Sequence, residues 1–116
     1  MSDFGLKTLC YLHEIADPGS KSISIEGKEL FAVKKRQQVY VYVNRCPHVQ
    51  LPLNWTPDRF LDKDNELIQC TSHGALFTID SGLCVAGPCP GRSLESVPVE
   101  IINGKISVAS SVLAQL

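Results

Sequence analysis

The chain is 116 residues long, which is enough for one domain with one hydrophobic core. Hydrophobic residues make up 44% of it and charged residues 20%, a composition that excludes a disordered tail. Eleven basic residues face twelve acidic ones, and the resulting net charge of −1 provides no basic field for binding nucleic acid.

The sequence contains no evident targeting or membrane-spanning segment. Its apolar runs are only a few residues long, too short to cross a bilayer. The N-terminus reads Met-Ser-Asp-Phe-Gly, without the basic segment and apolar run of a secretory signal. We therefore expect a single cytoplasmic domain, residues 1–116, with no nucleic-acid or membrane partner. The five cysteines are then expected to be reduced, and to act as metal ligands or redox groups before disulfides.

Many short β-like runs separated by turn residues predict an all-β fold. The runs are rich in β-branched and aromatic residues, which favour strands. The predicted strands are Ser22–Glu26, Glu29–Val33, Val39–Val43, Glu66–Cys70, Leu76–Ile79, Leu83–Ala86, Glu95–Ile102 and Lys105–Ala109. Helical periodicity is nearly absent, so we expect an antiparallel sandwich or barrel of about eight to ten short strands.

Turn signals separate several of these strands. Tight turns are predicted at Glu26-Gly27-Lys28, at Asp80-Ser81-Gly82 and at Asn103-Gly104, the last being a strong hairpin signal because both positions tolerate positive φ. The polar segment 34–37 is predicted as a hairpin tip. Its three positive charges suit either a solvated turn, which we favour, or partner docking.

One segment has local helical character. In Thr56–Leu61, Thr56 is a suitable N-cap and Pro57 suits the first helical position. We expect a helical turn here, with Trp55 and Phe60 forming its local core.

The remaining cysteines and the third histidine have less specific surroundings. Cys10 lies in the apolar run Thr8–Leu12 and is expected in the core, and His13 is expected on the surface. Cys84 precedes the stiff segment Gly87–Gly91, which contains Cys89 and two prolines. These two thiols are expected to be ordinary buried cysteines, although a disulfide or a regulatory pair stays open. The segment itself is either a plain connection or a rigid wall over a site that needs shielding.

Two short clusters carry candidate metal ligands. Cys46-Pro47-His48 and Cys70-Thr71-Ser72-His73 each follow a predicted strand, and Gly74 comes directly after the second cluster. Two thiolates and two imidazoles suit a structural zinc ion, and they equally suit a 2Fe–2S cluster with two Cys on one iron and two His on the other. Each cluster mixes one Cys with one His, which favours the iron–sulfur alternative. A buried thiol beside a hydrogen-bonded histidine, with no metal, is the third alternative, but two such pairs are not expected by chance.

The two clusters together resemble the binding motif of Rieske iron–sulfur proteins. The similarity runs from about Ser22 to Val108 and includes Leu76-Phe77, the Asp80-Ser81-Gly82 turn and the proline segment. It implies a Rieske-like antiparallel β-sandwich of three sheets. Its cluster-binding lobe, about 44–90, would be formed by two ligand loops and a proline loop. It also implies one 2Fe–2S cluster, with Cys46 and Cys70 on the buried iron and His48 and His73 on the outer one.

The spacing of the motif departs from most Rieske ferredoxins. Twenty-one residues separate His48 from Cys70, which is somewhat more than is usual in that family. We place the excess in Trp55–Asp64.

Individual residues distinguish the classes of Rieske protein that the resemblance allows. Leu51 and Ser72 stand where quinol-oxidising members have a second cysteine pair, and Ala75 and Phe77 replace the serine and tyrosine of that class. The missing hydroxyls predict a potential near the bottom of the roughly −150 to +300 mV Rieske range. The oxygenase class needs a further iron held by two histidines and a carboxylate, but only His13 remains.

The remaining class is the small Rieske-type ferredoxin, an electron carrier rather than an enzyme. Such a protein passes one electron from a reductase to an oxygenase or another terminal enzyme. Partner docking is expected near Val49, Leu51 and Pro88, although these side chains would equally suit plain packing. The alternatives are a small Rieske-like subunit of an oxidoreductase such as nitrite reductase, and a zinc-binding or structural module with this fold.

Overall fold

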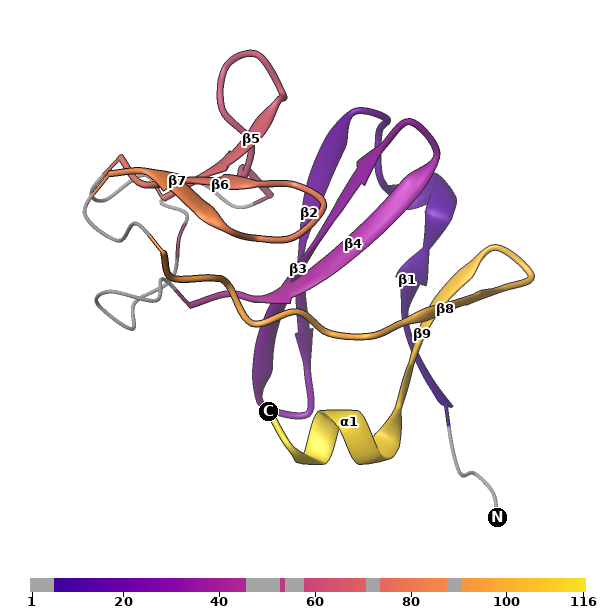
Figure 1. Ribbon diagram of the computed structural model, residues 1–116. Coiled ribbons are helices and arrows are strands. Elements are labelled where there is room, and N and C mark those ends of the chain that lie inside the picture. Colours follow the sequence, from indigo (N-terminus) through magenta and orange to yellow (C-terminus); the bar gives the residue numbers. More distant parts are fainter. Residues whose placement is uncertain (1–5, 46–52, 54–57, 71–73, 88–90) are drawn as a thin grey trace.

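The computed structural model describes residues 6–45, 53, 58–70, 74–87 and 91–116, which form three antiparallel three-stranded sheets (Figure 1). The central sheet contains β2 (Gly19–Ile25), β3 (Lys28–Lys35) and β4 (Gln38–Val43). A second sheet has the order β1 (Leu6–Tyr11), β9 (Lys105–Ala109) and β8 (Glu100–Ile102). The third contains β5 (Leu67–Gln69), β6 (Leu76–Thr78) and β7 (Cys84–Ala86). This confirms the predicted three-sheet, almost all-β architecture.

The central sheet is built from two hairpins with two-residue turns. Glu26 and Gly27 turn the chain between β2 and β3 with φ of 51° and 78°, and Arg36 and Gln37 turn it between β3 and β4 with φ of 54° and 67°. Paired positive φ values match the twist of the flanking strands. The predicted tip at 34–37 was therefore two residues too wide on its N-terminal side, because Lys34 and Lys35 belong to β3, and Gln38 begins β4.

The central sheet is buried on both faces, which explains four consecutive buried residues in β3. Leu30 and Ala32 face one core, and Phe31 and Val33 face the other. The first, here called the base core, is shared with the β1–β9–β8 sheet and consists of Cys10, Ile15, Ile23, Leu30, Ala32, Val41, Val43, Val97, Ile106, Val108 and Leu113. The second, here called the lobe core, is shared with the β5–β6–β7 sheet and consists of Phe31, Val33, Tyr42, Leu53, Phe60, Ile68, Cys70, Ala75, Phe77, Ile79, Cys84 and Leu94.

Four elements differ from the prediction. Strand β1 was not predicted, nor were the short helices η1 (Leu12–Glu14) and α1 (Ser110–Ala114). The predicted strand Glu95–Ile102 is wrong over its first five residues. That stretch follows β4 through isolated contacts, with the Val43 N–H on the Glu95 carbonyl at 2.9 Å, and Pro98 has no N–H to continue a ladder.

The predicted helical turn at Thr56–Leu61 is also wrong where the structure describes it. Asp58 has φ of 64°, and Leu61 forms an antiparallel bridge with Ile68, so residues 58–61 are not helical. Thr56, Pro57 and Trp55 lie outside the described residues. Phe60 is a core residue as predicted, with its ring stacked on Phe31 at 4.3 Å between centroids.

Asp58 attaches this segment to the free edge of the central sheet. Its carboxylate accepts the Ser22 N–H at 2.6 Å, and its carbonyl accepts the Ser20 hydroxyl at 2.8 Å. Because β2 is an edge strand, these bonds cover backbone that would otherwise be open to pairing. Within the described residues, neither η1 nor α1 has the length that a membrane-spanning helix requires.

Candidate metal centre

Cys70, the first residue of the second predicted ligand cluster, directly follows β5 at one end of the β5–β6 hairpin. The Cys70 N–H donates to the Ala75 carbonyl at 2.8 Å, and the Gly74 N–H donates to the Cys70 carbonyl at 2.8 Å. Gly74 has φ of 71°, a conformation that glycine adopts without strain. These bonds fix the backbone of Cys70 from both sides. His73 lies outside the described residues, so its ligand role stays a prediction.

The segment with the first predicted cluster leaves from the end of β4 and returns at Leu53. Asn44 ties its two ends together, because its side-chain oxygen accepts the Leu53 N–H at 2.9 Å. Leu53 is completely buried in the lobe core, which also contains Cys70. Cys46 and His48 lie outside the described residues, as do Val49 and Leu51 of the predicted docking rim.

The proline segment begins and ends next to the same hairpin. Gly87 follows β7 with φ of 94° and lies directly on the backbone of Ala75. Across the segment, the Cys84 N–H donates to the Arg92 carbonyl at 2.8 Å. Pro88 and Cys89 lie outside the described residues, so the predicted docking role of Pro88 and the pairing of Cys89 stay predictions.

The three segments therefore start and finish around one apolar floor. Leu53, Ala75 and Phe77 are fully buried and Cys84 is 4% exposed. Register places Phe77 opposite both Ile68 and Cys84, and all three belong to the lobe core. Ala75 and Phe77 present no hydroxyl, as the sequence indicated. The base of the site consequently excludes water and offers no hydroxyl donor at these two positions.

Cys70 is the one predicted ligand that the structure describes. Its side chain is fully buried, and within the described part of the chain its thiol forms no disulfide and no hydrogen bond. A buried polar group without a partner needs an explanation, and a metal–thiolate bond is one. The donor set of two Cys and two His predicted from the sequence fits a 2Fe–2S cluster of mixed ligation.

The other described cysteines and His13 are not among the predicted ligands. Cys10 is buried in the base core, where burial and the nearby Glu14 carboxylate raise the pKa of its thiol. The thiol of Cys84 donates to the Ala86 carbonyl at 3.3 Å, in agreement with a buried cysteine. His13 is exposed and stacks on Tyr11 at 5.5 Å between ring centroids, as expected for a surface residue.

Two supporting residues of the site were not predicted from the sequence. Asn44 closes the first segment, and its position two residues before Cys46 was its only sequence signal, since Asn commonly bonds to nearby backbone. Tyr42 anchors the lobe, because its hydroxyl donates to the Ile79 carbonyl at 2.6 Å. It was assigned to a strand without any special role.

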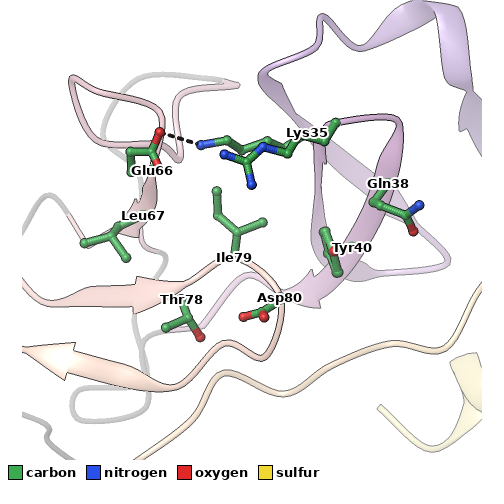
Figure 2. Close-up of a pocket in the computed structure, with 9 residues that line it drawn as sticks. Lys35, Gln38, Tyr40, Glu66, Leu67, Thr78, Ile79 and Asp80 are labelled. Carbon is green, nitrogen blue, oxygen red and sulfur yellow. Dashed lines mark ion pairs between the residues drawn. The ribbon is translucent and has the colours of Figure 1, made fainter.

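A separate cleft of about 360 Å³ lies at the opposite end of the β5–β6 hairpin (Figure 2). Lys35 crosses from the central sheet to this end, with its Nζ 2.9 Å from a Glu66 carboxylate oxygen and 2.6 Å from the Asn65 carbonyl. Tyr40 and Asp80 line the other side. Cys70 lies three positions after Leu67 of the cleft, which corresponds to a rise of about 10 Å along the strand direction. The cleft therefore belongs to the junction between sheets and not to the candidate metal centre.

Comparison with known proteins agrees with this geometry. The chain is 25% identical over 97 residues to the ferredoxin component of the naphthalene 1,2-dioxygenase system of Pseudomonas aeruginosa, covering 84% of this chain and 88% of that protein. The ferredoxin of Sphingomonas yanoikuyae B1 superposes with a TM-score of 0.73 and 25% identity, covering 90% of this chain and 97% of that one. A complex of reduced oxygenase and oxidised ferredoxin in carbazole 1,9a-dioxygenase contains a chain with a TM-score of 0.72 and 21% identity, with coverages of 90% and 92%. The family model for the Rieske [2Fe-2S] domain matches residues 6–105, and the chain belongs to this family.

Proposed function

We propose that the protein is a Rieske-type ferredoxin, a one-electron carrier between a reductase and an oxygenase or another terminal oxidoreductase. The observation that carries the proposal is the buried Cys70 thiol, without a partner in the described residues, in the lobe core where the ends of three loop segments meet. Membership of the Rieske [2Fe-2S] domain family supports it, as do relatives named as ferredoxin components of dioxygenase systems.

We propose Cys46, His48, Cys70 and His73 as the ligands of one 2Fe–2S cluster, with the two cysteines on one iron and the two histidines on the other. When bound, such a cluster supplies reversible one-electron chemistry. The chain's own contribution is to hold the Cys70 backbone through Ala75 and Gly74, and to keep water out with Leu53, Ala75 and Phe77. With no hydroxyl at positions 75 and 77, we expect a potential near the lower end of the roughly −150 to +300 mV range.

We assign the carrier role to one domain, residues 1–116, with its cluster-binding lobe at about 44–90 and no substrate-converting site of its own. The apolar character of the described floor supports the absence of acid–base catalysis there. Val49, Leu51 and Pro88 remain the proposed docking rim. Their segments begin and end at the lobe core, which supports a common position near the cluster. A cytoplasmic location remains part of the proposal.

The direct test is purification without oxygen, followed by iron, zinc and sulfide analysis and by EPR spectroscopy of the dithionite-reduced protein. We expect about two irons per chain, a rhombic signal typical of nitrogen-ligated 2Fe–2S centres, and uptake of one electron per chain in a reductive titration. One zinc per chain and no EPR signal would contradict the carrier role and favour the structural module.

Paired cysteine variants test the ligand assignment. Cys70→Ser is expected to lose the visible absorbance and the EPR signal, whereas Cys10→Ser, which changes an equally buried thiol in the base core, should retain both. Circular dichroism establishes that each variant is folded. Equal retention of the signal in the two variants would remove Cys70 from the ligand set.

A further inference from the structure

We infer that Gly87 is a positioning residue of the metal centre. Its missing side chain lets the end of β7 lie directly on the β5–β6 hairpin at Ala75, and this contact fixes the hairpin that carries Cys70. The inference rests on the proposed function, because its measurable consequence is a change in the properties of the bound cluster.

The contact between Gly87 and Ala75 is one of backbone against backbone. A Cβ built on Gly87 would lie close to three atoms of Ala75, at 2.6 Å from its Cα, 3.1 Å from its N and 3.2 Å from its Cβ. Favourable separations between carbon atoms are about 3.5–4.0 Å. Because the nearest atom is main chain, a side-chain rotation cannot relieve the clash. Any residue other than glycine must move either the hairpin or β7.

The hairpin transmits such a movement to the ligand. Ala75 is fully buried, and its carbonyl accepts the Cys70 N–H at 2.8 Å. Phe77 follows two residues later and is also fully buried, so this part of the hairpin is packed in the lobe core. A displacement at Ala75 is therefore a displacement at Cys70.

The β7 side of the contact is held equally firmly. The register between β6 and β7 shifts between Leu76 and Phe77, and the Cys84 thiol spans the shifted stretch to the Ala86 carbonyl at 3.3 Å. The Cys84 N–H is bonded to Arg92 beyond the proline segment. These bonds hold the end of β7, and therefore Gly87, in contact with Ala75. We therefore expect that β7 cannot move far enough by itself to make room for an added methyl group.

Two other glycines provide controls for the backbone strain and for the steric clash that an alanine at position 87 would introduce. Gly91 has φ of 84°, close to the 94° of Gly87, but a Cβ there would meet nothing within 4 Å. Gly91→Ala therefore reproduces the backbone strain without the contact. Gly82 lies close to a side chain instead of a backbone, since a Cβ there would lie 2.8 Å from Cε1 of Tyr42. Gly82→Ala therefore reproduces a clash in the lobe core without involving Ala75.

The experiment compares iron-loaded Gly87→Ala, Gly91→Ala and Gly82→Ala with the unmodified protein by redox titration and EPR. We expect Gly87→Ala to change the EPR g values and to shift the reduction equilibrium by about threefold or more, and Gly91→Ala to change neither, where a tenfold change corresponds to about 59 mV for one electron. Gly82→Ala should lower the free energy of unfolding and shift the reduction equilibrium less than Gly87→Ala does. A Gly87→Ala protein with two irons and the potential and spectrum of Gly91→Ala would overturn the inference.

Ala75→Val tests the same contact from the hairpin side at an ordinary backbone conformation. It is expected to change the g values and the potential as Gly87→Ala does. If both variants keep their strand signal in circular dichroism but lose iron that Gly91→Ala and Gly82→Ala retain, the contact is required to hold the hairpin. If Ala75→Val behaves like the unmodified protein, the contact does not position Cys70. Absence of a 2Fe–2S cluster from the unmodified protein would instead refute the proposed function.

Discussion

The two cores on either side of the central sheet are held together in different ways. The base core is closed by β1 and β9, strands of six and five residues that pair along their length. The lobe core is closed by β5, β6 and β7, each three residues long. Ladders this short supply few hydrogen bonds, so individual side chains must hold the lobe in place. In Figure 1 the lobe sheet lies to one side of the central sheet and the β1–β9–β8 sheet to the other.

The individual anchors of the lobe are identifiable. Tyr42 reaches the Ile79 carbonyl, Asn44 holds Leu53, and Lys35 reaches Glu66. Asp62 also orients the start of β5, since one carboxylate oxygen accepts the N–H groups of Glu66 and Leu67. The difference suggests that the base sheet and central sheet form a self-sufficient scaffold, whereas the order of the lobe depends on a few anchors. If the lobe binds the proposed cluster, its order depends on that cluster as well.

Phe31→Ala is expected to have the largest effect, because it removes the aromatic centre of the lobe core. The fully buried ring stacks on Phe60 at 4.3 Å and lies 5.7 Å from the Tyr42 ring. Truncation of a buried Phe costs about 3–5 kcal/mol of unfolding free energy. Denaturant unfolding of the iron-loaded protein measures it.

Ile106→Ala is the control in the base core, where its side chain is also fully buried. It is expected to cost about 2–5 kcal/mol but to leave the EPR spectrum unchanged, whereas Phe31→Ala should alter it. If the two variants have indistinguishable spectra, the division between a scaffold and a metal-dependent lobe is wrong.

Removal of the metal is expected to loosen the lobe and leave the base intact. After chelation of iron, amide hydrogen exchange in β5–β7 should accelerate about a hundredfold. Such an acceleration corresponds to a decrease of about 2.7 kcal/mol in the free energy of local unfolding. Exchange in β3 and β9 should change little, because their ladders are continuous and their side chains stay buried. Equal acceleration in all three sheets would show a single cooperative unit in place of two regions.

Tyr42→Phe is expected to cost about 1–3 kcal/mol at neutral pH, because the buried Ile79 carbonyl loses its donor. The variant keeps the ring and its packing, so it tests the anchor alone. Tyr40→Phe is the matched control, since that partly buried tyrosine lies two residues before Tyr42 on the same strand, β4. Equal stability of Tyr42→Phe and the unmodified protein would remove this bond from the anchors of the lobe.

The same variant has a pH signature. Burial, with smaller contributions from Asp80 and Tyr40, raises the pKa of Tyr42 from 10 to about 12. The folded state therefore favours the protonated phenol, and the associated stability is complete below pH 10 and lost as the pH rises toward 12. In urea titrations over this range, the unmodified protein should lose stability more steeply than Tyr42→Phe. Parallel curves would contradict the shift.

The elements at the two ends of the chain were predicted from the sequence with different success, for physical reasons. Lys105–Ala109 was predicted with its observed bounds, because Asn103 and Gly104 adopt φ of 52° and 76° and fix the register of its hairpin. Strand β1 escaped prediction because a register shift between Thr8 and Cys10 interrupts its alternation. The five residues of α1 are too few to establish a helical period.

The candidate metal centre was predictable only as far as residue types and spacing allow. Cys70 directly follows β5, in agreement with its predicted position after a strand. The sequence identifies Gly87 as a glycine before a proline, but the atom it must accommodate, the Ala75 Cα, is twelve residues away and becomes visible only in the fold. Close approaches between distant segments leave no local pattern, and the anchor role of Tyr42 was missed for the same reason.

Lys35→Met is expected to have the smallest effect on stability, because it tests the weakest of the anchors that hold the lobe. Its Nζ lies 2.9 Å from Glu66, whose side chain is 62% exposed, so solvent screens the pair and we expect a cost of about 0–1 kcal/mol. The lysine stem is mostly buried, and methionine preserves that packing while removing the bonds to Glu66 and the Asn65 carbonyl. The loss should shrink further in high salt, as measured by urea unfolding. A loss as large as that of Tyr42→Phe would mean that the junction cleft, and not the tyrosine, holds the lobe to the central sheet.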